Sequence, residues 1–145
     1  MNNVVFSRQS DEWETPDTLF ESLNTIFNFT LDAASSDDNF KLPKHYTINE
    51  DGLSKSWEGE RVFCNPPYSQ VKKWVKKSYD ERNKAEVIVL LIPARTDTKW
   101  FHDYVIGKSQ IYFCKGRLKF KGAKYNAPFP SMLCVYRGGG EIGDR

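Results

Sequence analysis

Apolar side chains recur at helical spacing in three stretches, between residues 19 and 27, between 71 and 79, and between 100 and 105. Each stretch predicts a helix with one apolar face. Thr15 is expected to cap the first helix, with Pro16 at its first helical position, because a hydroxyl can accept from the free N–H groups that begin a helix. Thr96 or Asp97 is expected to cap the third helix.

Shorter apolar runs predict strands at 27–31, 61–64, 87–92, 110–113, 118–120 and 132–136. The run 87–92 is continuous and rich in β-branched residues, which is typical of a central strand covered on both faces. Strands and helices alternate through most of the chain. The pattern therefore predicts an α/β fold with a mostly parallel sheet and antiparallel strands at the C-terminal end.

The length of 145 residues fits one domain, 1–145, with a loose arm at 1–12 and a glycine-rich tail at 138–145. No apolar run reaches the roughly 20 residues of a membrane span, and no signal peptide is recognised, so we expect a cytoplasmic protein. Cys64, Cys114 and Cys134 lie far apart in apolar runs, and we expect them to be buried, reduced thiols.

Charge is divided unevenly along the chain. Residues 1–65 contain 5 Lys and Arg against 12 Asp and Glu, whereas residues 66–145 contain 16 against 7. A basic half can contact phosphates and release their counterions, although solvated surface lysines would give the same count. Arg95, Lys99 and Arg117 are the candidates for contacts with DNA.

Two polar positions directly follow predicted strands. Asp32 follows the strand at 27–31, and Asn65 follows the strand at 61–64. Ligands of parallel sheets bind beyond the carboxyl ends of the strands, so we expect both residues at one rim of the sheet.

The tetrapeptide Asn65-Pro66-Pro67-Tyr68 suits chemistry on an exocyclic amine. The lone pair of such an amine is delocalised into the ring, which makes it a poor nucleophile. An Asn65 side-chain oxygen and the Pro66 carbonyl could accept both N–H bonds and draw the lone pair out of conjugation. Pro66 and Pro67 fix the backbone and remove two donors, and Tyr68 could stack on an extruded base. A proline turn between strand and helix is the simpler structural alternative.

In this context the tetrapeptide resembles motif IV of the amino-methyltransferases, and the chain is similar over about residues 13–136 to the small phage-type DNA N6-adenine methyltransferases, a Dam-like family. The resemblance rests on segments 13–16, 31–35, 46–47, 51–57, 65–69, 92–102, 116–120 and 127–131.

The resemblance implies a compact Rossmann-like methyltransferase fold that binds S-adenosylmethionine and methylates adenine N6 in DNA. Thr15 and Pro16 would lie at the methionine end of the cofactor, as would the turn that contains Asp32, Ala33 and Ser35. Two further residues complete the implied cofactor site. Asp51 would approach the adenosine part, and Asn65 would lie between cofactor and target base.

The chain departs from the common methyltransferase pattern in two respects. The turn after the first strand usually carries closely spaced glycines, but here it reads Asp-Ala-Ala-Ser over 32–35. The span from Asp32 to Asn65 is also short, so some of the usual strands or helices must be reduced or missing.

Other chemistries stay open on the residues alone. Cytosine N4 methylation would use the same hydrogen bonds, glutamine N5 methylation would act on a protein, and a module could bind DNA or cofactor without turnover. His45 and His102 show no metal-ligand spacing, so no metal is expected. No segment is long enough for a separate target-recognition domain, so we expect loose specificity or a very short site read by loops at 96–102 and 121–130. Monomer and homodimer both remain open.

Overall fold

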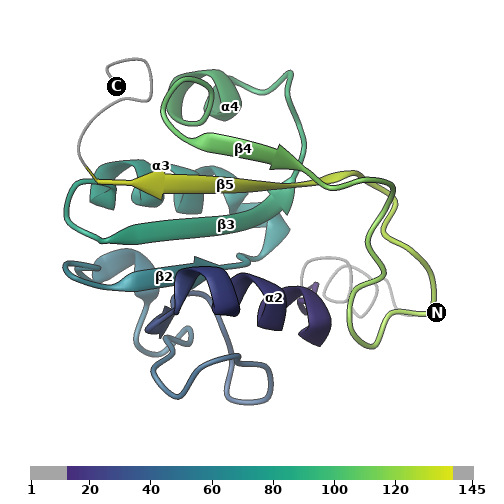
Figure 1. Ribbon diagram of the computed structural model, residues 1–145, viewed down its shortest axis with the longest axis horizontal. Helices are drawn as coiled ribbons and strands as arrows, with labels where there is room; N and C mark the ends of the chain where they lie inside the picture. Colours follow the sequence, from purple (N-terminus) through teal and green to yellow (C-terminus); the bar gives the residue numbers. More distant parts are fainter. Residues whose placement is uncertain (1–12, 139–145) are drawn as a thin grey trace.

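The computed structural model describes residues 13–138, which form a five-stranded sheet with helices on both faces (Figure 1). The strand order is β1-β2-β3-β5-β4. β1 (Leu31–Asp32), β2 (Arg61–Cys64) and β3 (Val87–Pro93) pair in parallel. β5 (Ser131–Arg137) runs antiparallel to β3 and to β4 (Gln110–Phe113), so the other four strands share one direction. The predicted α/β fold, with a mostly parallel sheet and antiparallel pairing among its C-terminal strands, is confirmed.

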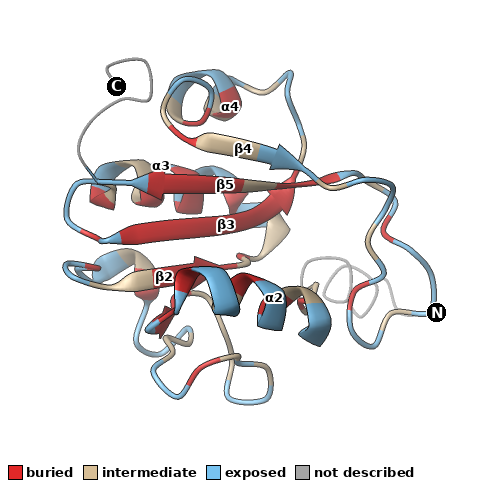
Figure 2. Ribbon diagram, viewed as in Figure 1, coloured by how far each residue is buried: buried red, intermediate tan, exposed pale blue. Residues whose placement is uncertain are grey.

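The central strand β3 divides the core in two. Ile88, Leu90 and Ile92 pack toward one face, in a cluster with residues of α3 (Val71–Glu81) and α4 (Lys99–Tyr104). Val87, Val89 and Leu91 pack toward the other face, in a cluster with residues of α2 (Asp17–Phe27). All seven β3 residues are buried, as predicted for a strand covered on both sides (Figure 2).

Two predicted strands and one predicted helix cap differ from the structure. The strand expected at 27–31 is reduced to β1, because α2 continues to Phe27 and ends at Asn28, whose φ of 53° is left-handed. The strand expected at 118–120 is a loop. The cap of α4 is Thr98, whose side chain accepts from Phe101 N–H, and not Thr96 or Asp97.

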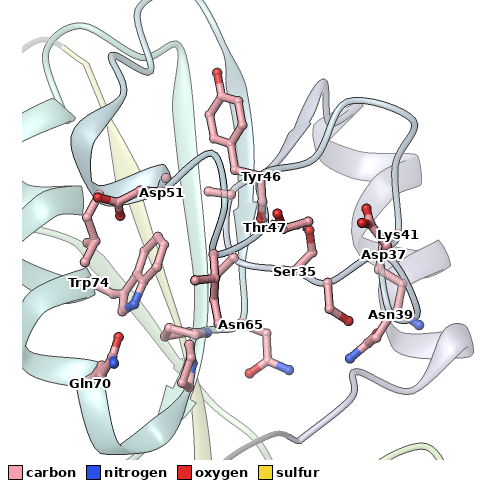
Figure 3. A pocket seen from close by; sticks show the side chains of 18 of the residues that line it. Ser35, Asp37, Asn39, Lys41, Tyr46, Thr47, Asp51, Asn65, Gln70 and Trp74 are labelled. Atoms are coloured by element: carbon pink, nitrogen blue, oxygen red, sulfur yellow. Dashed lines mark hydrogen bonds between the residues drawn. The ribbon is translucent and has the colours of Figure 1, made fainter.

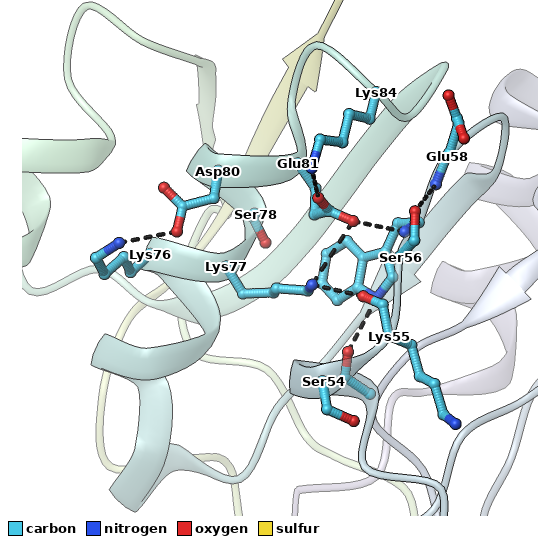
Figure 4. Close-up of polar contacts among 12 residues, drawn as sticks. Ser54, Lys55, Ser56, Glu58, Lys76, Lys77, Ser78, Asp80, Glu81 and Lys84 are labelled. Atoms are coloured by element: carbon cyan, nitrogen blue, oxygen red, sulfur yellow. Dashed lines mark hydrogen bonds and ion pairs between the residues drawn. The ribbon is translucent and has the colours of Figure 1, made fainter.

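Between β1 and β2, the chain forms only the short 3₁₀ helix η1 (Gly52–Ser54) and isolated bridges such as Asp32 with His45. A buried carboxylate fixes the end of this connection (Figure 4). Glu81 of α3 accepts from the Trp57 backbone N–H at 2.6 Å, and the Trp57 indole N–H donates to the Gly52 carbonyl at 3.1 Å. The connection is thereby tied to α3, and η1 is held near the carboxyl ends of the strands.

All three cysteines are free, as predicted. Cys64 and Cys134 are buried, whereas Cys114 is only half-buried, so the expectation of burial is wrong for Cys114. Among the described residues, no helix is long and apolar enough to cross a membrane. The predicted arm at 1–12 and residues 139–145 of the predicted tail lie outside the described residues.

Candidate active site

A pocket of about 730 Å³ opens at the carboxyl ends of β1 and β2. Its walls come from four parts of the chain, Trp13 and Thr15 before α2, residues 33–41 after β1, residues 46–53 around η1, and the stretch from Asn65 to Trp74 after β2. Figure 3 shows Asn65 between the Gln70 and Trp74 side of the pocket and the Asn39 and Lys41 side. The two polar strand ends therefore meet at one rim, as predicted.

Strand register explains why these segments meet. Asp32 is paired with Phe63, and the Ala33 N–H donates to the Phe63 carbonyl at 3.0 Å. The chain after β1 consequently begins beside the chain after β2, where Asn65 leaves the sheet. The Asp-Ala-Ala-Ser turn lies against Gly52, where an added Cβ would be 2.3 Å from the Ala33 carbonyl oxygen. This contact requires a glycine at position 52.

The Asn65 amide is the most unusual group in the pocket. Its Nδ2 donates to Thr15 Oγ1 at 3.0 Å and to the Trp13 carbonyl. Its Oδ1 is buried and has no hydrogen-bond partner. A buried acceptor without a partner costs about 1–3 kcal/mol, which makes Oδ1 a candidate for contact with a ligand N–H group.

The rest of the tetrapeptide shapes the surroundings of Asn65. Pro66 and Pro67 line the pocket, and Pro67 precedes the 3₁₀ helix η2 (Tyr68–Gln70). Tyr68 does not line the pocket. Its ring contacts Trp13, Phe120 and Phe129, with centroid distances of 6.4, 6.3 and 5.0 Å. Burial raises the pKa of the Tyr68 hydroxyl, which has no hydrogen-bond partner.

Asp32 lies beneath the pocket and does not line it. Its side chain is buried, and Oδ2 accepts from the Lys41 backbone N–H at 2.9 Å. Burial raises the pKa of this carboxyl to about 6, although the hydrogen bond from Lys41 and the charge of His45 oppose the shift. In this structure Asp32 therefore fixes the pocket loop and makes no direct contact with the cavity.

The predicted cofactor residues divide between the pocket and its support. Thr15, Ala33, Ser35, Asp51 and Asn65 line the cavity. The Ser35 hydroxyl is already engaged, donating to the Tyr46 carbonyl at 3.0 Å. Pro16 is outside the cavity and is the N-cap of α2, so the expected cap at Thr15 is wrong by one residue.

Several pocket residues were missed from the sequence. Trp74 was assigned to the core and is indeed buried, but it also lines the pocket, and its indole N–H is buried without a partner. Gln70 and residues 36–41 were not singled out. Gln70 is the N-cap of α3 and precedes Trp74 by four residues, about one helical turn, which is the signal that could have identified Gln70. The loop at 36–41 carries no such signal.

The three predicted DNA contacts lie outside the pocket. Arg95 and Arg117 are exposed and form no ion pair with the residues that the structure describes. Lys99 is exposed and pairs with Asp103 one turn further along α4. Hydrogen bonding to Asp103 raises the pKa of Lys99. Within residues 13–138 no group of three metal-ligating side chains occurs.

Comparisons with known proteins give the chain its family. A model of the DNA N-6-adenine-methyltransferase (Dam) family matches residues 3–134. The chain is 33% identical over 110 residues to a DNA N-6-adenine-methyltransferase of Escherichia phage T1, covering 74% of this chain and 46% of that protein. It is 30% identical over 116 residues to one of Haemophilus phage HP1, covering 76% and 66%.

One further relative matches a shorter part of the chain, and one solved structure has a lower sequence identity. The chain is 39% identical over 66 residues to the putative methyltransferase YfdM of Escherichia coli, covering 40% of this chain and 71% of that protein. The crystal structure of the 23S rRNA methyltransferase ErmE has a TM-score of 0.46 and 14% identity, covering 89% of this chain and 52% of that chain. Because the family model matches most of its length, the chain belongs to the DNA N-6-adenine-methyltransferase (Dam) family.

Proposed function

We propose that this protein transfers a methyl group from S-adenosylmethionine to the exocyclic N6 amine of adenine in DNA. Family membership supports the reaction class. The observation that carries the proposal is the buried Asn65 Oδ1, an acceptor without a partner that belongs to a residue lining a ligand-sized pocket. An exocyclic amine is a donor of the type that this oxygen lacks.

Asn65 and Pro66 would act on the amine by position. An N–H bond to Asn65 Oδ1 and a second to the Pro66 carbonyl place the two hydrogens of N6 on fixed acceptors, which turns the lone pair away from the ring. Because Oδ1 is shielded from water, this hydrogen bond forms without displacing a competing solvent bond. After transfer, the surplus N6 proton is acidic and passes to these acceptors or to water.

The pocket fits the cofactor in volume and in chemistry. Its volume of about 730 Å³ lies within the roughly 300–1,000 Å³ of pockets for ligands of this size. Asp51 lines it with a carboxylate that has no hydrogen bond in the described structure and would accept from ribose hydroxyls. The unpartnered Trp74 indole N–H would donate to the nucleoside, and residues 33–39 would hold the methionine end. S-adenosylmethionine supplies an electrophilic methyl group, whose bonding electrons remain on sulfur.

A basic segment beside the site would hold the DNA. The connection between β4 and β5 extends beyond the carboxyl end of β3, and its Phe120 and Phe129 pack against Tyr68 (Figure 1). Lys115, Arg117 and Lys119 of this connection are exposed and form no ion pair within the described residues. Together with Arg95 they offer contacts to phosphates, which position DNA without reading its sequence. We therefore expect loose specificity or a very short recognition site.

The test is to identify the methylated nucleoside directly. Purified protein is incubated with unmethylated DNA and S-adenosylmethionine, and the digested DNA is analysed by mass spectrometry. We expect N6-methyladenine from the native protein and from an Asn83→Ala control, since Asn83 is exposed at the end of α3, remote from the pocket lining. Asn65→Ala should lose at least about 100-fold in rate, as for removal of a preorganised transition-state hydrogen bond.

Each other outcome has a definite meaning. Formation of N4-methylcytosine would leave the role of Asn65 unchanged and would make cytosine the substrate. DNA without any methylated base, from protein that still binds S-adenosylmethionine, would overturn the proposal in favour of a protein substrate or of a module without turnover. Unchanged activity in Asn65→Ala would remove Asn65 from the reaction.

A further inference from the structure

The segment just before α2 contacts the Asn65 amide directly. Thr15 Oγ1 accepts from Asn65 Nδ2 at 3.0 Å, and the Trp13 carbonyl accepts from the same nitrogen. These residues lie 50 and 52 positions away from Asn65 in the chain. The amide group is thus oriented by a segment that belongs to neither of the two strand ends forming the rim.

The two partners allow only one orientation of the amide. A carbonyl oxygen can only accept, so the Trp13 carbonyl requires the nitrogen of Asn65, and not its oxygen, on that side. Thr15 Oγ1 then takes the second N–H. An amide turned by 180° would place Oδ1 against the Trp13 carbonyl and lose that bond, and only the Thr15 hydroxyl, which can also donate, could still pair with it. Oδ1 is thereby fixed as the group that remains unpaired.

The Thr15 hydroxyl is available for this contact because the helix does not use it. Pro16 is the N-cap of α2, and no side chain caps that end. Thr15 itself is only 2% exposed, so water does not compete for its hydroxyl. Accepting from Asn65 leaves the hydroxyl hydrogen free for another partner.

The position of Thr15 is fixed by contacts on both sides. The Trp13 ring lies 5.4 Å from Phe120 and 5.3 Å from Phe129, and the Lys121 backbone N–H donates to the Glu14 carbonyl at 2.9 Å. After Thr15, the Phe20 N–H donates to the Pro16 carbonyl at 3.0 Å as α2 begins. The hydroxyl therefore meets Asn65 in a preorganised position, and not through a mobile end.

We propose that Thr15 is a positioning residue that locks the Asn65 amide with its oxygen toward the target amine. This inference rests on the proposed function, and it differs from the role in cofactor binding that sequence resemblance implies for Thr15. A lock of this kind acts on turnover. Without the Thr15 hydroxyl only the Trp13 carbonyl restrains the amide, which then rotates more freely, and only one of its orientations accepts from the amine. Cofactor affinity should depend little on the hydroxyl.

The kinetic test compares three variants at saturating DNA. Thr15→Val removes the hydroxyl at nearly constant volume, Thr15→Ser restores it, and Thr25→Val is the control, since the exposed Thr25 hydroxyl only donates to the Glu21 carbonyl within α2. We expect kcat to fall about tenfold in Thr15→Val, which is the loss of one hydrogen bond of typical strength, and to return to within about twofold in Thr15→Ser. Cofactor affinity, measured by calorimetry with S-adenosylhomocysteine, should change less than about twofold. Weakened cofactor binding with unchanged kcat, or a Thr15→Ser variant as slow as Thr15→Val, would overturn the proposal.

A second readout does not depend on activity. In the ¹⁵N NMR spectrum, the side-chain NH₂ signals of Asn65 are assigned by their disappearance in Asn65→Ala. We expect these protons to exchange slowly with solvent in the native protein and faster in Thr15→Val, with no change in Thr25→Val. Rapid exchange in the native protein would overturn the lock even if Thr15→Val fails to fold. Slow exchange in a protein that methylates no DNA would retain the lock and reject the proposed function.

Discussion

Asp32 should make the protein less stable as pH rises through the mildly acidic range. Its carboxyl is 3% exposed, and burial raises its pKa from 3.8 to about 6 despite the hydrogen bond from Lys41 and the charge of His45. Between these two values the folded protein binds more protons at this site than the unfolded chain does. The free energy of unfolding contributed by Asp32 is therefore highest below pH 4, falls as pH rises to about 6, and is constant above it. A difference of about 2 pKa units corresponds to about 3 kcal/mol.

The variant Asp32→Asn isolates this effect. We would measure urea unfolding of both proteins from pH 4 to pH 8 and follow the difference in unfolding free energy, variant minus wild type. It should rise by about 2 kcal/mol between pH 4 and pH 7, because only the wild type bears the cost of a buried charge and part of the change already occurs below pH 4. Asp17→Asn is the control, and its difference should be nearly flat over this range, since hydrogen bonds from Lys41 and Lys121 lower the pKa of exposed Asp17 and move its titration below the measured pH values. A difference that is flat or falling for Asp32→Asn would refute the reasoning.

Three further substitutions test the support of the pocket. Gly52→Ala should reduce the free energy of unfolding by at least about 2 kcal/mol in urea titrations, because its Cβ would lie 2.3 Å from the Ala33 carbonyl oxygen. The same variant should bind the cofactor more weakly in calorimetry, and unchanged affinity would argue against this contact as a pocket wall. Glu81→Gln retains an acceptor for the Trp57 N–H but loses the charge that faces two lysines, so we expect a loss of about 1–3 kcal/mol by chemical denaturation, and a larger loss in Glu81→Ala. Tyr68→Phe removes a buried hydroxyl that has no partner, so its melting temperature should stay the same or rise, and a clear drop would indicate a hidden partner.

The sequence predicted the helices and strands whose apolar pattern directly reflects which of their faces are buried. The continuous apolar run of β3 has both faces covered, and the face of α2 packs against one side of the sheet. Asn65 could be placed at the rim because a parallel strand directly precedes it. In each case a local pattern determines the outcome, so a single sequence is sufficient.

The missed features depend on contacts between distant segments. From its neighbours in the sequence Thr15 is predicted to cap a helix, yet its hydroxyl accepts a hydrogen bond from an amide 50 residues away. Asp32 reads as a pocket carboxylate because it follows a strand, but the loop that returns through the Asp32–His45 bridge covers it. Trp74 reads as a core residue by its helical spacing, and only the position of η1 reveals that its buried side chain also borders a cavity.

Gly52 makes a close backbone contact beside the turn after β1, which itself contains no glycine. Closely spaced glycines normally allow a ligand or a neighbouring backbone to approach that turn, whereas here residues 32–35 include none. The close approach occurs instead from the opposite wall, where Gly52 lies against the Ala33 carbonyl and beside the Trp74 ring. The Trp57 indole N–H holds the Gly52 carbonyl, and Glu81 holds the Trp57 backbone, so this wall is fixed from α3. A residue without a side chain is thus required at position 52, on the η1 side of the pocket, whereas the turn at 32–35 contains none.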